Sequence, residues 1–256
     1  MCHEIEALPP LPPISGGADL PSATDMTLTS RDGTVFSAFS ATHSDIGGPG
    51  VVILPDVRGL FRFYKELADR FASVGVHACA IDYFGRTAGT EERPGEWDYA
   101  PHVRQTDPDL IADDTAAAID LLRSHEGGGA ERVYTVGFCF GGRNSFNQAA
   151  RGHGLAGVVG FYGRVARTDD SDSDAPVDRV RDFDCPVLGL FGGADQAVSV
   201  EDVRSFEEAL EDSGVSNEVV VYEGVPHSFF DRKADEFRDV CDDAWVRMLR
   251  FFGVPA

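Results

Sequence analysis

One short segment of the sequence carries a residue pattern suited to nucleophilic chemistry. A β-branched run over residues 133–136 leads directly into Gly137-Phe-Cys139-Phe-Gly141 and then into a helix start. A sharp strand-to-helix turn would project Cys139 at the carboxyl end of a sheet, because Gly137 and Gly141 relieve crowding where the backbone doubles back. The helix amino terminus favours an anion, so Cys139 is predicted to be a thiolate nucleophile. The alternative is a buried structural cysteine in a glycine-rich turn.

Two residues further along the chain could complete a catalytic triad. Asp195 follows an apolar run in the turn Gly-Gly-Ala-Asp, and His227 follows another in the loop Val-Pro-His-Ser-Phe. In parallel-sheet hydrolases the acid and then the histidine follow the nucleophile along the chain, as they do here. Taken singly, Asp195 could be a turn former and His227 a surface residue. Together with Cys139 they predict acyl transfer, with His227 as the base and Asp195 as the acid that orients it.

Short apolar runs must position these residues, and most of them are β-branched and bounded by Gly, Pro or Asp. The expected strands cover Val35–Ala41, Val51–Leu54, Ala78–Ile81, Val133–Val136, Gly157–Phe161, Val187–Phe191 and Val219–Tyr222. Helical patterns with a 3.6-residue period alternate with them. Strand–helix alternation over this length predicts an α/β fold, with a mostly parallel central sheet covered by helices on both faces.

The expected helices have recognisable starts and apolar faces. Asp107-Pro108 suits the cap and first position of a helix, and Ser199 with Asp202 resembles a capping box. The last helix is the clearest, since a wide apolar stripe runs from Phe237 to Phe252.

Length and composition favour one folded unit with an extension. The 256 residues suit a single α/β domain over residues 24–256, and the Pro/Gly-rich residues 1–23 predict an extended arm. The Asp-rich segment Asp169–Asp184 predicts a solvated loop, with a lid over the active site as the alternative.

The charge balance excludes several classes of partner. Acidic residues outnumber basic ones by 43 to 22, giving a net charge of −21, which repels nucleic acid and anionic membrane surfaces. No apolar stretch is long enough to span a membrane. The five cysteines have no regular spacing and the amino terminus lacks a signal-peptide pattern, so a reducing cytoplasm is expected.

The three motifs together resemble the dienelactone hydrolase family of the α/β-hydrolase fold over roughly residues 24–253. The resemblance implies that Cys139 is the family nucleophile, His227 its base and Asp195 the orienting acid. It also implies an oxyanion hole made by the backbone N–H groups of Phe140 and Val57.

The resemblance also suggests how substrate is bound, with two departures. Asp56 stands where the family has a glutamate that contacts the thiol, and is one methylene shorter; a helix cap is its alternative role. Arg86 matches one of two arginines that bind a substrate carboxylate. The second arginine position holds Asp231, with Arg232 next to it. Tyr162 could line the pocket or serve as a strand-end aromatic.

These observations predict a cytoplasmic, cysteine-dependent hydrolase of small esters or lactones that forms an acyl-enzyme. Its partner would be a small molecule, anionic if the arginines bind a carboxylate, and no cofactor or metal is expected. Cys2-His3 lacks a second ligand pair at zinc spacing. A broad carboxylesterase or thioesterase with the same triad is one alternative, and a weakly catalytic ligand-binding protein on this scaffold is another. The sequence leaves the oligomeric state open.

Overall fold

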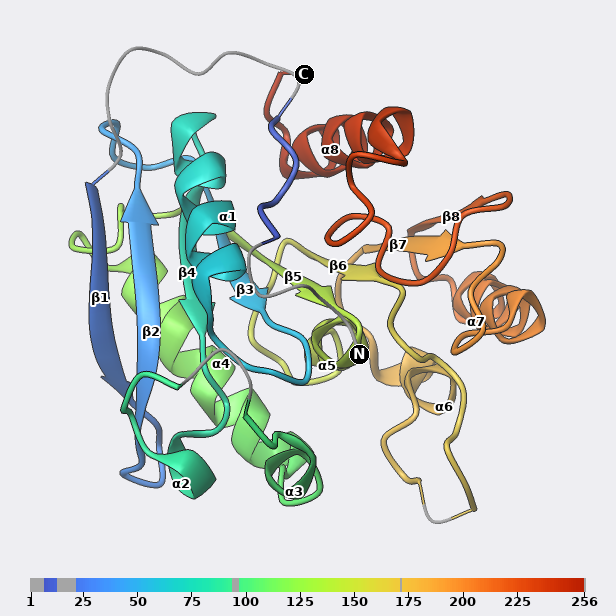
Figure 1. Cartoon of the computed structure of the whole chain (residues 1–256), viewed down its shortest axis with the longest axis horizontal. Coiled ribbons are helices and arrows are strands. Elements are labelled where there is room, and N and C mark those ends of the chain that lie inside the picture. The colour runs from blue at the N-terminus through green and yellow to red at the C-terminus, as the bar shows by residue number, and fades with distance from the viewer. Residues whose placement is uncertain (1–6, 13–21, 94–96, 171, 256) are drawn as a thin grey trace.

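A computed structural model describes residues 7–12, 22–93, 97–170 and 172–255. An eight-stranded sheet forms its centre, with the order β1-β2-β4-β3-β5-β6-β7-β8 (Figure 1). β2 pairs antiparallel with both β1 and β4. The other strands, β4, β3, β5, β6, β7 and β8, run parallel to one another. The strands are Ser22–Thr29, Val35–Thr42, Pro49–Leu54, His77–Ile81, Arg132–Phe138, Gly157–Phe161, Val187–Gly192 and Asn217–Tyr222 for β1 to β8.

Helices cover both faces of this sheet (Figure 1). The longer ones are α1 (Arg62–Ser73), α4 (Pro108–Arg123), α5 (Phe140–Gln148), α7 (Val200–Asp212) and α8 (Arg238–Phe252), and the short ones are α2 (Gly85–Ala88), α3 (Ala100–Val103), α6 (Pro176–Arg179) and the 3-10 turn η1 (Val180–Asp182). Apolar residues of α1 and α8 belong to one core cluster, and those of α4, α5 and α7 belong to another on the opposite face. The predicted α/β architecture is therefore confirmed.

Side chains along the central strands point alternately to the two faces of the sheet, which explains the two cores. In β3, Val51 and Ile53 belong to the cluster under α1 and α8, while Val52 and Leu54 belong to the other. Successive side chains of a strand point to opposite faces, so a continuous apolar run is what a strand buried on both sides requires.

All seven predicted strands are present, with boundaries within three residues of those expected. The predicted caps are present as well: the Asp107 side chain accepts from the N–H of Asp109 at 2.8 Å, and the Ser199 hydroxyl accepts from the N–H of Asp202 at 3.1 Å. The additional strand β1 was not predicted, because its polar sequence lacks a continuous apolar run and its side chains are largely exposed.

The predicted arm over residues 1–23 differs from the structure in two respects. β1 begins at Ser22, inside the expected arm. Residues 7–12 form no helix or strand, but Pro9 is buried and the indole N–H of Trp245 in α8 donates to the carbonyl of Pro10 at 3.0 Å. Residues 1–6, including Cys2 and His3, and residues 13–21 lie outside the described residues.

The strand register brings the predicted site residues to one edge of the sheet. Leu54 at the end of β3 pairs with Gly137 in β5, and Phe138 pairs with Phe161 at the end of β6. Gly192 at the end of β7 pairs with Tyr222 at the end of β8. The loops that follow these strands therefore converge at the carboxyl edge, where ligands bind in parallel α/β sheets.

Candidate active site

Cys139 occupies the sharp turn between β5 and α5. Its backbone has φ 56° and ψ −111°, a positive-φ conformation that is uncommon for a residue other than glycine. Such a conformation costs about 1–3 kcal/mol and persists only where the surroundings impose it. Here the N–H of Cys139 donates to the carbonyl of Phe161 at 3.0 Å, which ties the turn to the neighbouring strand.

Glycines permit the close packing around this turn. A Cβ on Gly137 would lie 1.9 Å from the carbonyl oxygen of Gly141, and one on Gly141 would lie 2.0 Å from the carbonyl oxygen of Leu54. No larger residue fits at either position without moving backbone. The amino terminus of α5, which begins at Phe140, is thus held against the segment after β3 that leads to Val57.

His227 and Asp195 come together from two other loops. The Nδ1 atom of His227 donates to Oδ2 of Asp195 at 2.7 Å, and the other carboxylate oxygen accepts from the N–H groups of Ala197 at 2.7 Å and Val198 at 3.2 Å. The Asp195 side chain is 1% exposed and the His227 side chain 20% exposed. A buried carboxylate with these partners fixes the protonated nitrogen of the imidazole toward itself and leaves Nε2 available as a base.

Cys139 and the His227–Asp195 pair line one cavity of about 880 Å³. This volume lies at the upper end of the range for small-molecule sites, which is roughly 300–1,000 Å³. The walls come from the end of α3 and the residues after it, and from segments that follow β5, β6, β7 and β8: Val103, Thr106, Cys139, Phe140, Arg143, Tyr162, Arg164, Thr168, Asp172, Ala194, Asp195, Gln196, Ala197, Val198, Pro226, His227, Arg232 and Lys233.

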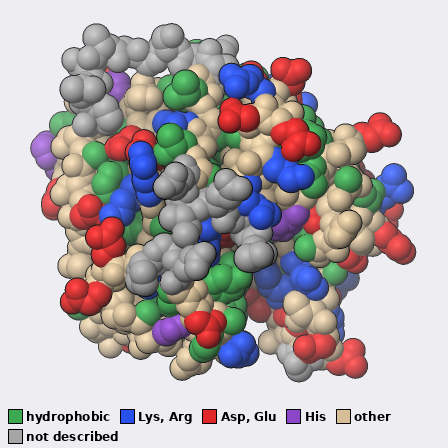
Figure 2. Space-filling model, viewed as in Figure 1, with side chains coloured by type: hydrophobic (Ala, Val, Ile, Leu, Met, Phe, Trp, Pro, Cys, Tyr) green, Lys and Arg blue, Asp and Glu red, His purple; other side chains and the backbone are tan. Residues whose placement is uncertain are grey.

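The cavity carries more positive than negative side chains although the chain as a whole is acidic. Arg143, Arg164, Arg232 and Lys233 line it, against Asp172 and the Asp195 already paired with His227. Among the described residues, neither Arg164 nor Arg232 forms an ion pair with a carboxylate. In Figure 2, acidic side chains are spread along the rim of the viewed face, while a group of Lys and Arg side chains lies nearer its centre.

Tyr162 lines the cavity, as one of its two predicted roles requires, but its hydroxyl has a protein partner. The hydroxyl donates to Oδ2 of Asp231 at 3.1 Å, and the ring centroid lies 4.8 Å from that of His227. Asp231 is itself 3% exposed and does not line the cavity, whereas its neighbour Arg232 does. The structure thus brings Arg232, and not residue 231, to the site.

Arg86 is placed away from this cavity. Its guanidinium donates to Asp114 at 2.6 Å, to Asp32 at 3.0 Å and to the hydroxyl of Ser30 at 2.9 Å. The Asp114 side chain is fully buried in α4, so its charge requires a cationic partner. The helical turn of α2 directs Arg86 to this partner and to the β1–β2 turn, and these contacts use the guanidinium donors that a substrate carboxylate would need.

Asp56 is fully buried in the turn after β3 and is not among the residues that line the cavity. Its Oδ1 accepts from the N–H of Arg58 at 2.9 Å, Oδ2 lies 3.6 Å from the Arg58 guanidinium, and its own N–H donates to the Tyr64 hydroxyl at 2.9 Å. Burial, together with the charges of Asp56, Asp82 and Cys139, raises the pKa of Tyr83. Through its hydrogen bonds to Tyr64 and Arg58, Asp56 holds the turn that contains Val57.

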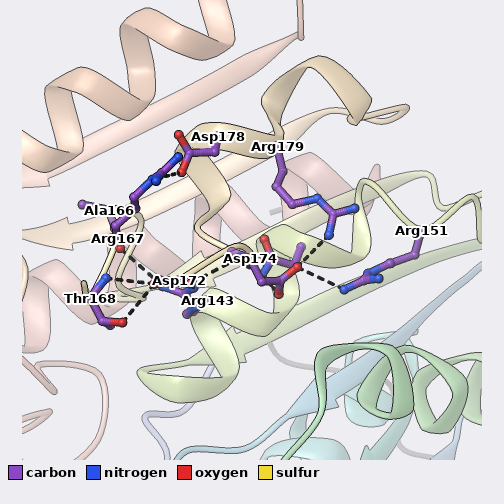
Figure 3. Close-up of polar contacts among 10 residues, drawn as sticks. Arg143, Arg151, Ala166, Arg167, Thr168, Asp172, Asp174, Asp178 and Arg179 are labelled. Atoms are coloured by element: carbon purple, nitrogen blue, oxygen red, sulfur yellow. Dashed lines mark hydrogen bonds and ion pairs between the residues drawn. The ribbon is translucent and has the colours of Figure 1, made fainter. Parts of the chain in front are cut away.

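The Asp-rich segment is more ordered than the predicted solvated loop. Asp172 accepts from Arg143 of α5 at 2.6 Å, and Asp174 accepts from Arg151 at 3.1 Å and from Arg179 at 2.6 Å (Figure 3). The segment also contains α6 and η1. Its acids are therefore used to attach it to the helix that follows the nucleophile, and Asp172 forms part of the cavity wall.

Sequence reasoning missed the cavity role of Arg164 and Lys233. Arg164 lies two residues after Tyr162, just beyond the end of β6, so its position after a parallel strand was the available signal. Lys233 belongs to the irregular stretch between His227 and α8, where the sequence has no periodicity that orients a side chain.

The sheet order and this edge site define the chain as an α/β-hydrolase, and comparisons with known proteins agree. The model of the dienelactone hydrolase family matches residues 36–254, so the chain belongs to that family of carboxylic ester hydrolases. A Salmonella typhimurium protein named as a carboxymethylenebutenolidase is 31% identical over 218 residues, covering 82% of this chain and 78% of its own.

Two further relatives have similar coverage. A Bradyrhizobium protein named as a 2-oxo-3-(5-oxofuran-2-ylidene)propanoate lactonase is 28% identical, covering 78% of this chain and 82% of its own. The solved structure of a Klebsiella pneumoniae protein named as a dienelactone hydrolase superposes with a TM-score of 0.80 at 27% identity, covering 92% of this chain and 99% of that one. Within the described residues, no helix has the length and apolarity needed to cross a bilayer.

Proposed function

We propose that the protein hydrolyses an ester or lactone through a covalent acyl-enzyme on Cys139. The observation that carries this proposal is the His227–Asp195 pair, joined at 2.7 Å, in one cavity with a cysteine held at φ 56° on a strand-to-helix turn. His227 takes the thiol proton, the thiolate attacks the carbonyl carbon, and the alkoxide leaves with a proton from the imidazolium. Water activated by His227 then cleaves the thioester and releases the acid.

The tetrahedral oxyanion would be bound by the N–H groups of Phe140 and Val57. The contact of Gly141 with the backbone after β3 supports this pairing, because it holds both segments together. One such donor is worth about 10²–10³ in rate. The hydrogen bonds of Asp56 to the turn favour a role in holding Val57 rather than in contacting substrate.

Cys139 is the best candidate nucleophile among the described cysteines. Burial raises the pKa of Cys79, Cys185 and Cys241 to about 12, so these thiols stay protonated and unreactive. Cys139 is partly exposed and stands at the amino terminus of the nine-residue helix α5. The helix dipole favours the thiolate there.

The substrate would carry a negative charge. Arg164 and Arg232 line the cavity without a carboxylate partner among the described residues, and Lys233 adds a third cation. In a chain with a net charge of −21, such arginines have many acids to pair with, so their position in the cavity favours an anionic ligand. The lactonase named among the relatives also has a carboxylate in its substrate's name.

A broad carboxylesterase or thioesterase is the second candidate, and the cavity volume of about 880 Å³ favours it. A small lactone would leave much of this space to water. A panel of dienelactones, neutral aryl esters and thioesters separates the candidates. Strong selectivity for the anionic lactone supports the first, and comparable kcat/KM values across the panel support the second.

Cys139→Ala provides the direct test of the mechanism. Ester turnover should fall to background while the thermal midpoint stays near that of the wild type, because a partly exposed side chain is shortened by one atom. Trapping of an acyl adduct on the Cys139 peptide by mass spectrometry would support the covalent step. Near-normal turnover by Cys139→Ala would refute it.

A cytoplasmic location and the absence of a nucleic-acid partner remain part of the proposal. The four cysteines in the described ranges are free thiols, as a reducing compartment maintains them, and the net charge of −21 disfavours binding to phosphate backbones.

A further inference from the structure

A tyrosine lies against the imidazole of His227, and its hydroxyl is bonded to a buried aspartate. The ring of Tyr162 packs on His227 at a centroid distance of 4.8 Å and an interplanar angle of 55°. Its hydroxyl donates to Oδ2 of Asp231 at 3.1 Å. The mechanism proposed above uses neither residue, although Tyr162 is 1% exposed and Asp231 3% exposed.

Backbone hydrogen bonding and aromatic packing both hold Tyr162 in place. Its backbone has φ 40°, an uncommon value for a residue with a bulky side chain. Its N–H donates to the carbonyl of Leu190 at 2.8 Å, and its ring also contacts Phe161 and Phe229. Burial and the charge of Asp231 raise the pKa of the Tyr162 hydroxyl, so it remains a donor at neutral pH.

His227 needs such support because its own segment is irregular. It lies in the loop between β8 and α8, where no regular backbone hydrogen-bond pattern orients it. The bond from Nδ1 to Asp195 fixes the edge of the ring, and the Tyr162 ring packed at 4.8 Å restricts its tilt. Together these contacts set the direction of Nε2.

We propose that Tyr162 and Asp231 form a positioning pair that holds the His227 imidazole in the orientation needed to serve Cys139. This inference rests on the proposed acyl-enzyme function. Asp231 anchors the tyrosine hydroxyl, the tyrosine ring supports the histidine, and both residues act on the reaction through His227. The pair also accounts for an acid at position 231, since a buried carboxylate receives the hydroxyl while the adjacent Arg232 lines the cavity.

The chain offers a matched control for this pair. The Tyr222 hydroxyl donates to Asp243 at 2.7 Å, and the Tyr222 ring packs on Phe229, as that of Tyr162 does. Tyr222 does not line the cavity, and no ring contact joins it to His227 in the described part of the chain. Tyr222→Phe therefore removes a similar hydroxyl–carboxylate bond without affecting the histidine.

The test compares Tyr162→Phe, Asp231→Ala, Asp231→Asn and Tyr222→Phe. Two quantities are measured: kcat and KM on an aryl ester, and the rate of iodoacetamide alkylation of the Cys139 peptide at neutral pH. Tyr162→Phe and Asp231→Ala should lower kcat and the alkylation rate about 10-fold or more, because a misplaced base costs up to about 100-fold. KM should change less than about two-fold, since no substrate contact is lost. Asp231→Asn keeps an oxygen acceptor and should recover most of the loss.

Three results would overturn the proposal. One is wild-type kcat and alkylation in Tyr162→Phe. Another is a rise in KM at unchanged kcat, which would make Tyr162 a substrate contact. The third is an equal loss in Tyr222→Phe, which would indicate a general effect of packing. A failure of the proposed function has a different signature, namely that wild-type Cys139 is alkylated no faster than an ordinary thiol.

Discussion

The ion pair between Arg143 and Asp172 gives a quantitative prediction for the charge of the substrate. Both residues line the cavity, and the Arg143 guanidinium donates to Asp172 at 2.6 Å and to the carbonyl of Ala166 at 3.3 Å (Figure 3). Asp172 thus reduces the attraction that Arg143 can exert on an anionic substrate. Asp172→Asn removes this charge and should lower the KM for anionic esters.

The size of the effect follows from Coulomb's law. A substrate carboxylate bound on the other side of the Arg143 guanidinium would lie about 6 Å from Asp172, which is two hydrogen-bond lengths. At that separation the repulsion is about 0.7 kcal/mol at the dielectric constant of water and about 3 kcal/mol at an effective value of 20. A water-filled cavity lies nearer the first limit. We therefore expect KM for an anionic ester to fall about five-fold, and KM for its neutral analogue to stay within two-fold.

Asp174→Asn is the matched control. Asp174 lies two residues away, pairs with Arg151 at 3.1 Å and Arg179 at 2.6 Å, and does not line the cavity. Both variants change the net charge by one and both loosen the same segment, so only a local effect separates them. Steady-state kinetics on an isosteric pair of esters, one anionic and one neutral, measures the difference. An equal fall in KM for both esters, or for both variants, would refute the reasoning.

Three other outcomes are expected. Raising salt from about 10 to 150 mM should lower KM more for anionic than for neutral esters, because the Debye length shrinks from about 25–30 Å to 8 Å and screens the surface acids; equal responses would argue for a neutral substrate. Arg86→Met should leave KM unchanged but lower stability by about 3–5 kcal/mol, since it strands buried Asp114, and thermal or urea unfolding measures this. A large rise in KM would instead indicate that Arg86 contacts the substrate. The bond from Arg86 lowers the pKa of Asp32 to about 2, so this carboxylate stabilises the fold above its unfolded pKa of 3.8 and loses that contribution as pH falls toward 2. Thermal midpoints of the wild type and Asp32→Asn should therefore converge near pH 2, and a constant gap would contradict the assignment.

The order and spacing of strands, helices and turns could be predicted from the sequence because local rules govern them. Continuous apolar runs such as Val51–Leu54 indicate strands buried on both faces, and Asp107 and Ser199 indicate helix starts through bonds to residues two or three positions on. Gly137 predicts a tight turn for the same reason, since the contact it relieves is with Gly141, four residues on, whereas Gly141 itself relieves a contact with Leu54 of a distant strand. β1 escaped prediction because its stability comes from pairing with β2 and not from its own pattern.

Only the tertiary structure decided which charged side chains reach the cavity. Arg86 occupies the position expected of a substrate ligand, yet its side chain is drawn to Asp114 of a distant helix. Arg164 and Arg232 reach the cavity, Asp172 becomes the counter-charge of Arg143, and Asp231 is buried against Tyr162. Long side chains have many rotamers of similar energy, so their direction is set by the nearest opposite charge or hydrogen-bond partner. In this fold those partners lie as far as 69 residues away in the chain, where no local pattern reports them. The sequence by itself determined the fold and a candidate nucleophile, base and acid, because these depend on local backbone chemistry. The electrostatic character of the site depends on contacts between distant segments, and these exist only in the folded chain.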